Sequence, residues 1–502
     1  MEVKLKESVY AGWDCVFDQQ LRREESTECV VPDTQPDIAA VLSTCGTPLI
    51  RSKDVGEGRV RVEANIPVKT AYLSEEGSVC CLDVNIPFSV SAEDADIAAG
   101  SLCTADLHLL ALETKVLNPR KVSVRAELCF AVRCYQTGRI AFYGAPEGER
   151  CGVQLLEKEL TFTPVCAVTE KTFVLTDEYP LPPDAPIPAQ ILCQRTVLET
   201  EEIKTVGTKI ILKGSAKSSL LYLSAEGTPA AAEFTTGFSQ IVEAEGLPED
   251  AAVTAVLLPS GAYYDISGGG RSIGMETHVV AQLVIRGRVR LCCVTDAYSN
   301  RRALEMELDT QTHTVLHRSA VLRETLREQI ETPTPVGEVL CVCAVPGCPT
   351  VNGGEAVLPL SVQMFYADPS GSLAAVKRCF TMKFSTDAAA GERVGIAAAA
   401  LQEAHAVPSA GGAELRVPAE LTALYFAEEE LTAVTGIRFD ETQELDLSGV
   451  PTLTLLRACS SDDLWPLAKA NCSTVDAIRA ANRLDELTAP WEQMILIPKV
   501  TD

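Results

Sequence analysis

The chain has 502 residues, of which 46% are apolar, and a formal net charge of −26. The apolar content excludes a wholly disordered chain, because disorder requires low hydrophobicity as well as high charge. The excess of 69 acidic over 43 basic side chains disfavours nucleic acids and anionic membranes as partners, because both attract Lys and Arg.

At about 150 residues per domain, this length indicates roughly three domains. The N-terminal residues from Met1 to Ser8 lack the apolar core of a signal peptide. No run of about 20 apolar residues, the length that crosses a bilayer, occurs in the chain. We therefore expect a protein that stays in the cytoplasm and does not insert into a membrane.

The 19 cysteines lie in apolar, strand-like segments. Because no export signal is present, we expect reduced thiols that pack as small hydrophobic side chains. Cys341, Cys343 and Cys348 lack the paired spacing of a zinc site. The sequence predicts neither a metal ion nor another cofactor.

Alternation of polar and apolar residues is the main structural signal in the first part of the chain. Residues 58–64 and 122–128 alternate with the period of a half-buried strand. Residues 72–79 predict a strand, a turn and a second strand, with Gly77 at positive φ in the turn. These patterns indicate a β-rich first domain over residues 1–160.

One segment of this domain recurs twice. Tyr72, Tyr222 and Tyr366 each begin a segment that leads into a glycine-containing turn, and they are separated by 150 and then 144 positions. Such domain-sized spacing indicates tandem domains, because solenoid repeats are much shorter. We assign the second domain to residues 161–310 and the third, more divergent one to residues 311–445.

Three further segments have more local interpretations. The run Gly268-Gly269-Gly270 predicts a hairpin turn. Residues 303–329 are highly charged and are compatible with a helix or with the strand that opens the third domain. His313 and His317 lack the intervening Glu of a metalloprotease motif, so we expect both on the surface. The predicted fold is mainly β, with three sandwich-like repeats.

The pattern changes after about residue 450. Residues 453–457 predict a short strand, and residues 464–471 predict a helix that Ser461 or Asp462 caps. These elements open a small C-terminal domain over residues 450–502.

A second helix and a closing strand complete this domain. Ser473 and Asp476 have the spacing of a capping box before a helix at residues 475–482. Residues 494–498 predict the last strand. The predicted order is therefore strand, helix, helix, strand.

The C-terminal segment resembles a LysM module. Residues 463–469, 474–478, 481–482 and 492–498 follow the LysM pattern in order and spacing. LysM modules hold N-acetylglucosamine units in a groove between two loops. The resemblance assigns this groove to Ser461, Asp462, Asp463, Leu464, Trp465, Thr488, Ala489, Pro490, Trp491 and Glu492.

Both groove loops depart from the LysM pattern. Ser461, Asp462 and Asp463 replace its Gly-Asp-Thr turn, and Glu492 replaces its glycine. Because glycine permits backbone conformations that other residues avoid, these changes favour a protein partner over a glycan. We expect Trp465 to fill the module core and Trp491 to serve in surface recognition.

The repeats resemble the SPOCS domain of spore-coat-associated proteins in endospore-forming bacteria. In the first repeat, the residues that carry the resemblance are 31–38, 58–64, 72–76 and 86–89. The second repeat contributes residues 237–238 and 296–299. SPOCS domains followed by one LysM module form the arrangement of a family that partners the spore-coat morphogenetic ATPase.

The resemblance implies a non-enzymatic scaffold of spore-coat assembly. Its LysM module would dock the coat ATPase and recruit other coat proteins to the forespore surface, within the mother-cell cytoplasm. The alternative is a protein that binds peptidoglycan, a polymer containing N-acetylglucosamine. The sequence lacks G-x-S-x-G, a P-loop and a convincing acid pair, so we expect no enzyme activity.

Overall fold

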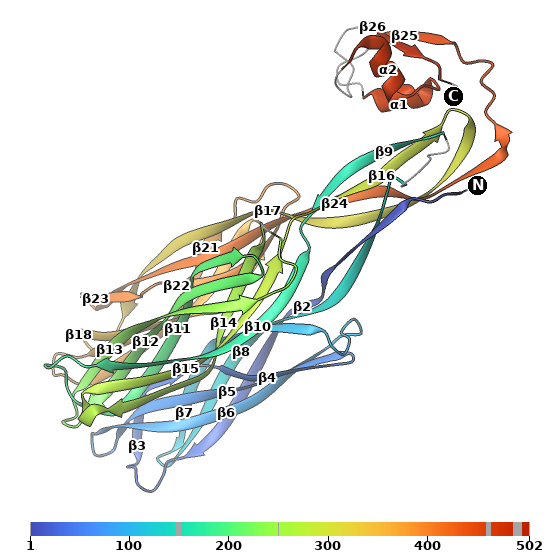
Figure 1. Cartoon of the computed structure of the whole chain (residues 1–502). Coiled ribbons are helices and arrows are strands. Elements are labelled where there is room, and N and C mark those ends of the chain that lie inside the picture. The colour runs from blue at the N-terminus through green and yellow to red at the C-terminus, as the bar shows by residue number, and fades with distance from the viewer. Residues whose placement is uncertain (1, 147–151, 249, 458–462, 485–493, 501–502) are drawn as a thin grey trace.

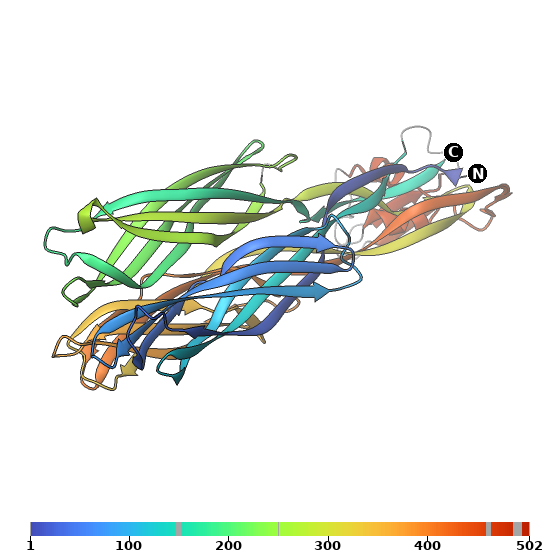
Figure 2. The same ribbon diagram turned by 90° about the horizontal axis from the view of Figure 1, so that it is seen from below.

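The computed structural model describes residues 2–146, 152–248, 250–457, 463–484 and 494–500. This part of the chain contains 26 β-strands, two α-helices and one short 3₁₀ turn, so the predicted mainly-β fold is confirmed. Three β-sandwiches lie side by side at one end of the elongated molecule, and a small helical module lies at the other (Figure 1, Figure 2).

The first sandwich has two facing sheets around one core. One sheet contains β3 (Ile38–Gly46), β4 (Leu49–Gly56), β5 (Arg59–Ser74) and β6 (Val79–Glu93), and the other includes β2 (Lys6–Val30), β7 (Leu102–Asn118) and β8 (Lys121–Gly144). In β8, Val122, Val124 and Leu128 are fully buried, as the alternation predicts. Gly77, in the turn between β5 and β6, has a φ of 84°, also as predicted.

The second sandwich has the same two-sheet arrangement. One sheet contains β11 (Pro188–Val206), β12 (Lys209–Ser224) and β13 (Pro229–Glu243), and the other includes β10 (Val165–Pro180), β14 (Ala252–Ser267) and β15 (Ser272–Arg286). Pairing of Val165 with Trp13 joins β10 to β2, so the first two sandwiches share a six-stranded sheet. Gly268–Gly270 turns the chain between β14 and β15, as predicted.

In the third sandwich, residues 303–329 form a strand and not a helix. They belong to β17 (Arg302–Glu331), which pairs with β24 (Gly412–Glu444) along its whole length. The remaining strands are β18 (Glu338–Pro346), β19 (Thr350–Asn352), β20 (Glu355–Ala367), β21 (Leu373–Ser385), β22 (Arg393–Leu401) and β23 (His405–Ser409). The charged segment is therefore a strand, because β24 satisfies its backbone hydrogen-bonding groups and lets charged side chains face solvent.

Six strand segments extend beyond the sandwiches and pack together as a stem (Figure 1). We define the stem as residues 6–15, 135–144, 302–316 and 426–444 together with β9 (Val153–Phe162) and β16 (Val289–Ser299). The short strand β1 (Glu2–Val3) pairs with β24 at its edge. Val153, Val294 and Val434 form part of the stem core.

The stem corrects the predicted surface position of His313. This side chain is 4% exposed, and its ring lies 5.8 Å from the ring of Phe142 and 5.6 Å from that of Phe162. Burial accordingly lowers the pKa of His313. The expectation was wrong because both aromatic neighbours come from other sandwiches' strands, which the local sequence does not reveal.

The C-terminal module consists of β25 (Leu453–Arg457), α1 (Leu464–Ala470), α2 (Val475–Asn482) and β26 (Met494–Pro498), with β25 and β26 antiparallel. Its elements lie where the sequence predicts them. The capping residues differ from the prediction, because each lies one or two residues later in the chain. Asp463 caps α1, and at α2 the Thr474 side chain accepts the hydrogen bond from the backbone N–H of Ala477. Ser461 and Asp462 lie outside the described residues.

Candidate functional site

The structure describes three of the predicted groove residues, Asp463, Leu464 and Trp465. The others lie outside the described residues: Ser461, Asp462, Thr488, Ala489, Pro490, Trp491 and Glu492. The described part of the predicted groove is therefore its α1 side.

Asp463 and Leu464 have structural roles. The Asp463 carboxylate accepts a hydrogen bond of 3.1 Å from the backbone N–H of Trp465, which satisfies one of the unpaired donors at the start of α1. Leu464 is fully buried in the module core with Ile478 and Ile495. Its side chain therefore has no surface to offer a ligand.

Trp465 joins the module to the stem. It belongs to the module's hydrophobic cluster and is 7% exposed. Its ring packs edge-on against Tyr298 of β16 in the stem, at 4.8 Å between centroids. Its indole N–H donates a hydrogen bond of 2.8 Å to the Asp296 carboxylate. Trp465 therefore fills a core, as expected, and that core is shared with the stem.

Asp296 is the charged centre of this contact. Lys469 on α1 places its ammonium 2.7 and 2.8 Å from the two Asp296 carboxylate oxygens. Partial burial raises the pKa of Asp296, but hydrogen bonds from Lys469 and Trp465 outweigh it and hold that pKa below its ordinary value. The carboxylate is therefore ionised at neutral pH and links two side chains of the same helix to the stem.

Two more stem residues bind the loop between α1 and α2. The Tyr298 hydroxyl and the Asn300 amide both donate to the backbone carbonyl of Ser473, at 2.9 and 3.0 Å. Asp296, Tyr298 and Asn300 alternate along the chain, so they share one face at the end of β16. Sequence reasoning assigned residues 296–299 to the repeat itself. Their polar alternation was the only local sign of a docking face.

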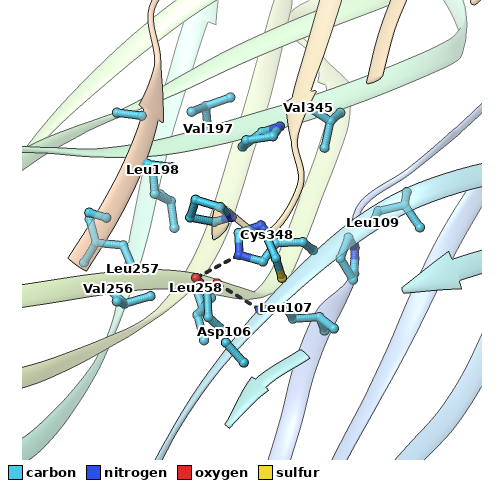
Figure 3. Close-up of a pocket in the computed structure, with 18 of the residues that line it drawn as sticks. Asp106, Leu107, Leu109, Val197, Leu198, Val256, Leu257, Leu258, Val345 and Cys348 are labelled. Carbon is cyan, nitrogen blue, oxygen red and sulfur yellow. Dashed lines mark hydrogen bonds and ion pairs between the residues drawn. The ribbon is translucent and has the colours of Figure 1, made fainter. Parts of the chain in front are cut away.

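A second candidate site is the cleft where the three sandwiches meet (Figure 3). It has a volume of about 1050 Å³ and is lined by residues of all three sandwiches, including Leu109, Val197 and Val345. At its wall, the His108 imidazole lies 2.9 Å from the Asp106 carboxylate. Although burial opposes both charges, this pairing raises the pKa of His108 and lowers that of Asp106.

The described ranges contain no three His, Cys, Asp or Glu side chains placed to hold one metal ion. Neither α1 nor α2 has the length and apolar character that a bilayer crossing requires.

Several polar contacts hold the loop between β2 and β3 of the first sandwich. The Arg120 guanidinium binds the Asp37 carboxylate at 2.8 Å and donates to the carbonyl oxygens of Val31 and Gln35, both at 2.9 Å. The hydroxyl of the fully buried Tyr72 donates to the carbonyl of Pro36 at 3.1 Å. These contacts fix the proline-rich loop over one end of the core.

Residues 37–117, which extend from Asp37 in this loop through most of β7, match the protein family described as "SipL, SPOCS domain". The chain contains a SPOCS domain. This match supports a sporulation-related protein. A comparison with curated proteins found no match.

Tyr72 and Asp37, both of which carry the sequence resemblance, lie within the matched residues. They belong to the same network of contacts around the proline-rich loop. The SPOCS domain also contains Asp106 and His108, so one wall of the cleft comes from it. β8 completes the sandwich from outside the matched residues.

Proposed function

We propose that this protein is a non-enzymatic scaffold of spore-coat assembly. The SPOCS domain at residues 37–117 carries the proposal. The C-terminal module acts as a LysM domain that docks the spore-coat morphogenetic ATPase, as the resemblance to the clostridial spore protein SipL implies. The scaffold recruits further coat proteins to the forespore surface from the mother-cell cytoplasm.

The proposal treats the second and third sandwiches as further SPOCS-like domains. Tyr222 pairs with Ile191, and Tyr366 pairs with Val339, each across from a bulge in the neighbouring strand. Both tyrosines are as buried as Tyr72. Three such domains on one chain offer several contact surfaces, and weak contacts in tandem raise the effective concentration of each partner.

The proposal assigns ATPase docking to Trp491, which the LysM resemblance places in the groove. The reason is that the stem already occupies the Trp465 side of the module, through Asp296 and Tyr298. An aromatic side chain in a recognition loop is a typical interface hot spot.

The test measures binding of the full chain to immobilised coat ATPase and to purified peptidoglycan. We expect binding to the ATPase, and we expect Trp491→Ala to weaken it by about tenfold or more. Tyr263→Ala is the matched control, because Tyr263 is an exposed aromatic residue on the second sandwich. It should leave ATPase binding unchanged.

Two results would contradict the proposal. Binding to peptidoglycan alone would make the protein a glycan-binding wall protein, the alternative that LysM modules suggest. Binding to the ATPase that survives Trp491→Ala but not substitutions on the sandwiches would move recognition away from the module.

A further inference from the structure

Cys129 of β8 is buried although its side chain lies on the face of the strand that points away from the core of the first sandwich. Leu128 and Phe130 point into the core of the first sandwich and are fully buried. Cys129 lies between them, so its side chain faces outward, yet it is only 3% exposed. Another part of the chain must therefore cover it.

The cover is the segment of the third sandwich between β18 and β19. Its Pro349 carbonyl accepts a hydrogen bond of 3.2 Å from the Gln20 amide of β2. Pro346, the last residue of β18, has its carbonyl beside the His108 imidazole and raises the pKa of that group. Between these two residues, Cys348 projects towards the outer face of the first sandwich, beside Cys129, whose pKa it influences more than any other group does. Figure 3 shows Cys348 in the cleft near Leu107 and Asp106.

Two cations flank this pair of thiols. Cys129 is opposite Arg22 of β2 on one side and opposite His108 of β7 on the other. The neighbouring Asp106 carboxylate raises the pKa of His108 and so favours its protonated form. The Cys348 thiol, then His108 and Arg22, lower the pKa of Cys129 to about 7 against the effect of burial. The pKa of Cys348 is raised, mainly by the neighbouring Cys129 and by burial. Cys129 is thus the thiolate and Cys348 the proton donor.

We propose that Cys129 and Cys348 form an oxidation site whose product is a disulfide between the first and third sandwiches. The oxidant is a small peroxide that enters through the cleft, which Cys348 lines. The Cys129 thiolate attacks hydrogen peroxide, forms a sulfenic acid and releases hydroxide. The Cys348 sulfur then displaces hydroxide from that sulfenic acid. The protons of the two original thiols end in water, so two thiols and one peroxide give one disulfide and two waters.

His108 acts in this site as a fixed positive charge. Its Nε2 lies 2.9 Å from the Asp106 carboxylate, and Asp106 and the Pro346 carbonyl both raise its pKa, so its role here is to stabilise the thiolate by its charge. The site differs in this respect from a hydrolase with a cysteine nucleophile, in which the histidine is the base.

A second thiol pair provides a comparison within the same sandwich. Cys103 and Cys134 are directly opposite on β7 and β8, and Cys103 lowers the pKa of Cys134. Both belong to the first sandwich, so a bond between them would join only strands that are already paired. Cys103→Ser is therefore the matched control.

The experiment treats the reduced full chain with hydrogen peroxide at pH 7, blocks remaining thiols with N-ethylmaleimide and identifies linked peptides by mass spectrometry. We expect a Cys129–Cys348 cross-link that dithiothreitol removes and that Cys103→Ser retains. In Cys348→Ser the cross-link should be absent, and dimedone should trap the sulfenic acid at Cys129. Arg22→Gln should slow this trapping roughly threefold, since it removes one of two stabilising cations.

Exposed Cys379 serves as the internal measure of oxidation. Oxidation of Cys379 while Cys129 and Cys348 both remain open to alkylation would overturn the proposal. So would a cross-link from Cys129 to a cysteine other than Cys348.

Discussion

The molecule is held together at two junctions of opposite character. At the sandwich junction, β3, β11 and β18 meet through apolar side chains and thiols: Cys45, Leu192, Cys193, Leu221, Cys341, Cys343 and Phe365. At the module junction, one carboxylate, one hydroxyl and one amide of the stem bind α1 and the loop that follows it. The first junction depends on the burial of apolar surface, whereas the second combines the buried contact of Trp465 with Tyr298 and a few directed hydrogen bonds.

This difference indicates how permanent each junction is. Apolar burial changes little with salt or with pH near neutrality, so the three sandwiches should behave as one unit. An ion pair whose Lys469 side chain remains 41% exposed is screened by salt. The C-terminal module is therefore the part of the molecule that a partner can detach.

Phe365→Ala should produce the largest effect, because it removes a fully buried ring from the sandwich junction. We expect a loss of about 3–5 kcal/mol in the free energy of unfolding, measured by urea denaturation. Val407→Ala is the control, since Val407 is 64% exposed in the same sandwich. Equal losses for both variants would show that the sandwiches do not depend on this junction.

Asp296→Asn should release the module while the sandwiches stay folded. It removes the charge that binds Lys469 and Trp465, at a cost of about 1.5 kcal/mol, the low end for hydrogen bonds to charged groups. Hydrogen exchange in α1 should accelerate while exchange in β5 stays unchanged. Asp83→Asn is the control, because Asp83 forms an exposed ion pair with Lys69. Faster hydrogen exchange in β5 of Asp296→Asn would show that the two junctions are not independent of each other.

Tyr298→Phe should weaken the module junction more gently. The ring that packs on Trp465 remains, and Asn300 still donates to the Ser473 carbonyl. Loss of one neutral hydrogen bond costs about 1 kcal/mol, detectable as faster cleavage by a protease between β24 and β25. Unchanged cleavage would assign the anchoring of this loop to Asn300 alone.

Acidification should weaken the module junction within a narrow pH range. The folded-state pKa of Asp296 is lower than its ordinary value of 3.8, so the stabilisation is complete above 3.8. It is lost as the pH falls from there through the lowered value. Hydrogen exchange in α1 should follow this titration in the native chain. In Asp296→Asn that titration should disappear, and its persistence would implicate another carboxylate.

The sequence predicts the local structure well, because alternation and turn glycines are local properties. Gly77 at positive φ and the buried face of β8 follow from a few adjacent residues. The burial of His313 and Cys129 does not, because each is covered by residues from another sandwich. The docking of Trp465 on Asp296 was missed for the same reason, since 169 positions separate them.

The pairing of β1 with β24 has a consequence for synthesis. Val3 lies beside Ile437, so during synthesis β1 waits for a strand that is made roughly 430 residues later. At about 5–20 residues per second this wait lasts roughly 20–90 seconds. Contacts of such long range slow folding. The stem closes only after β24 has emerged from the ribosome, which makes stem closure a later step than the folding of the first two sandwiches.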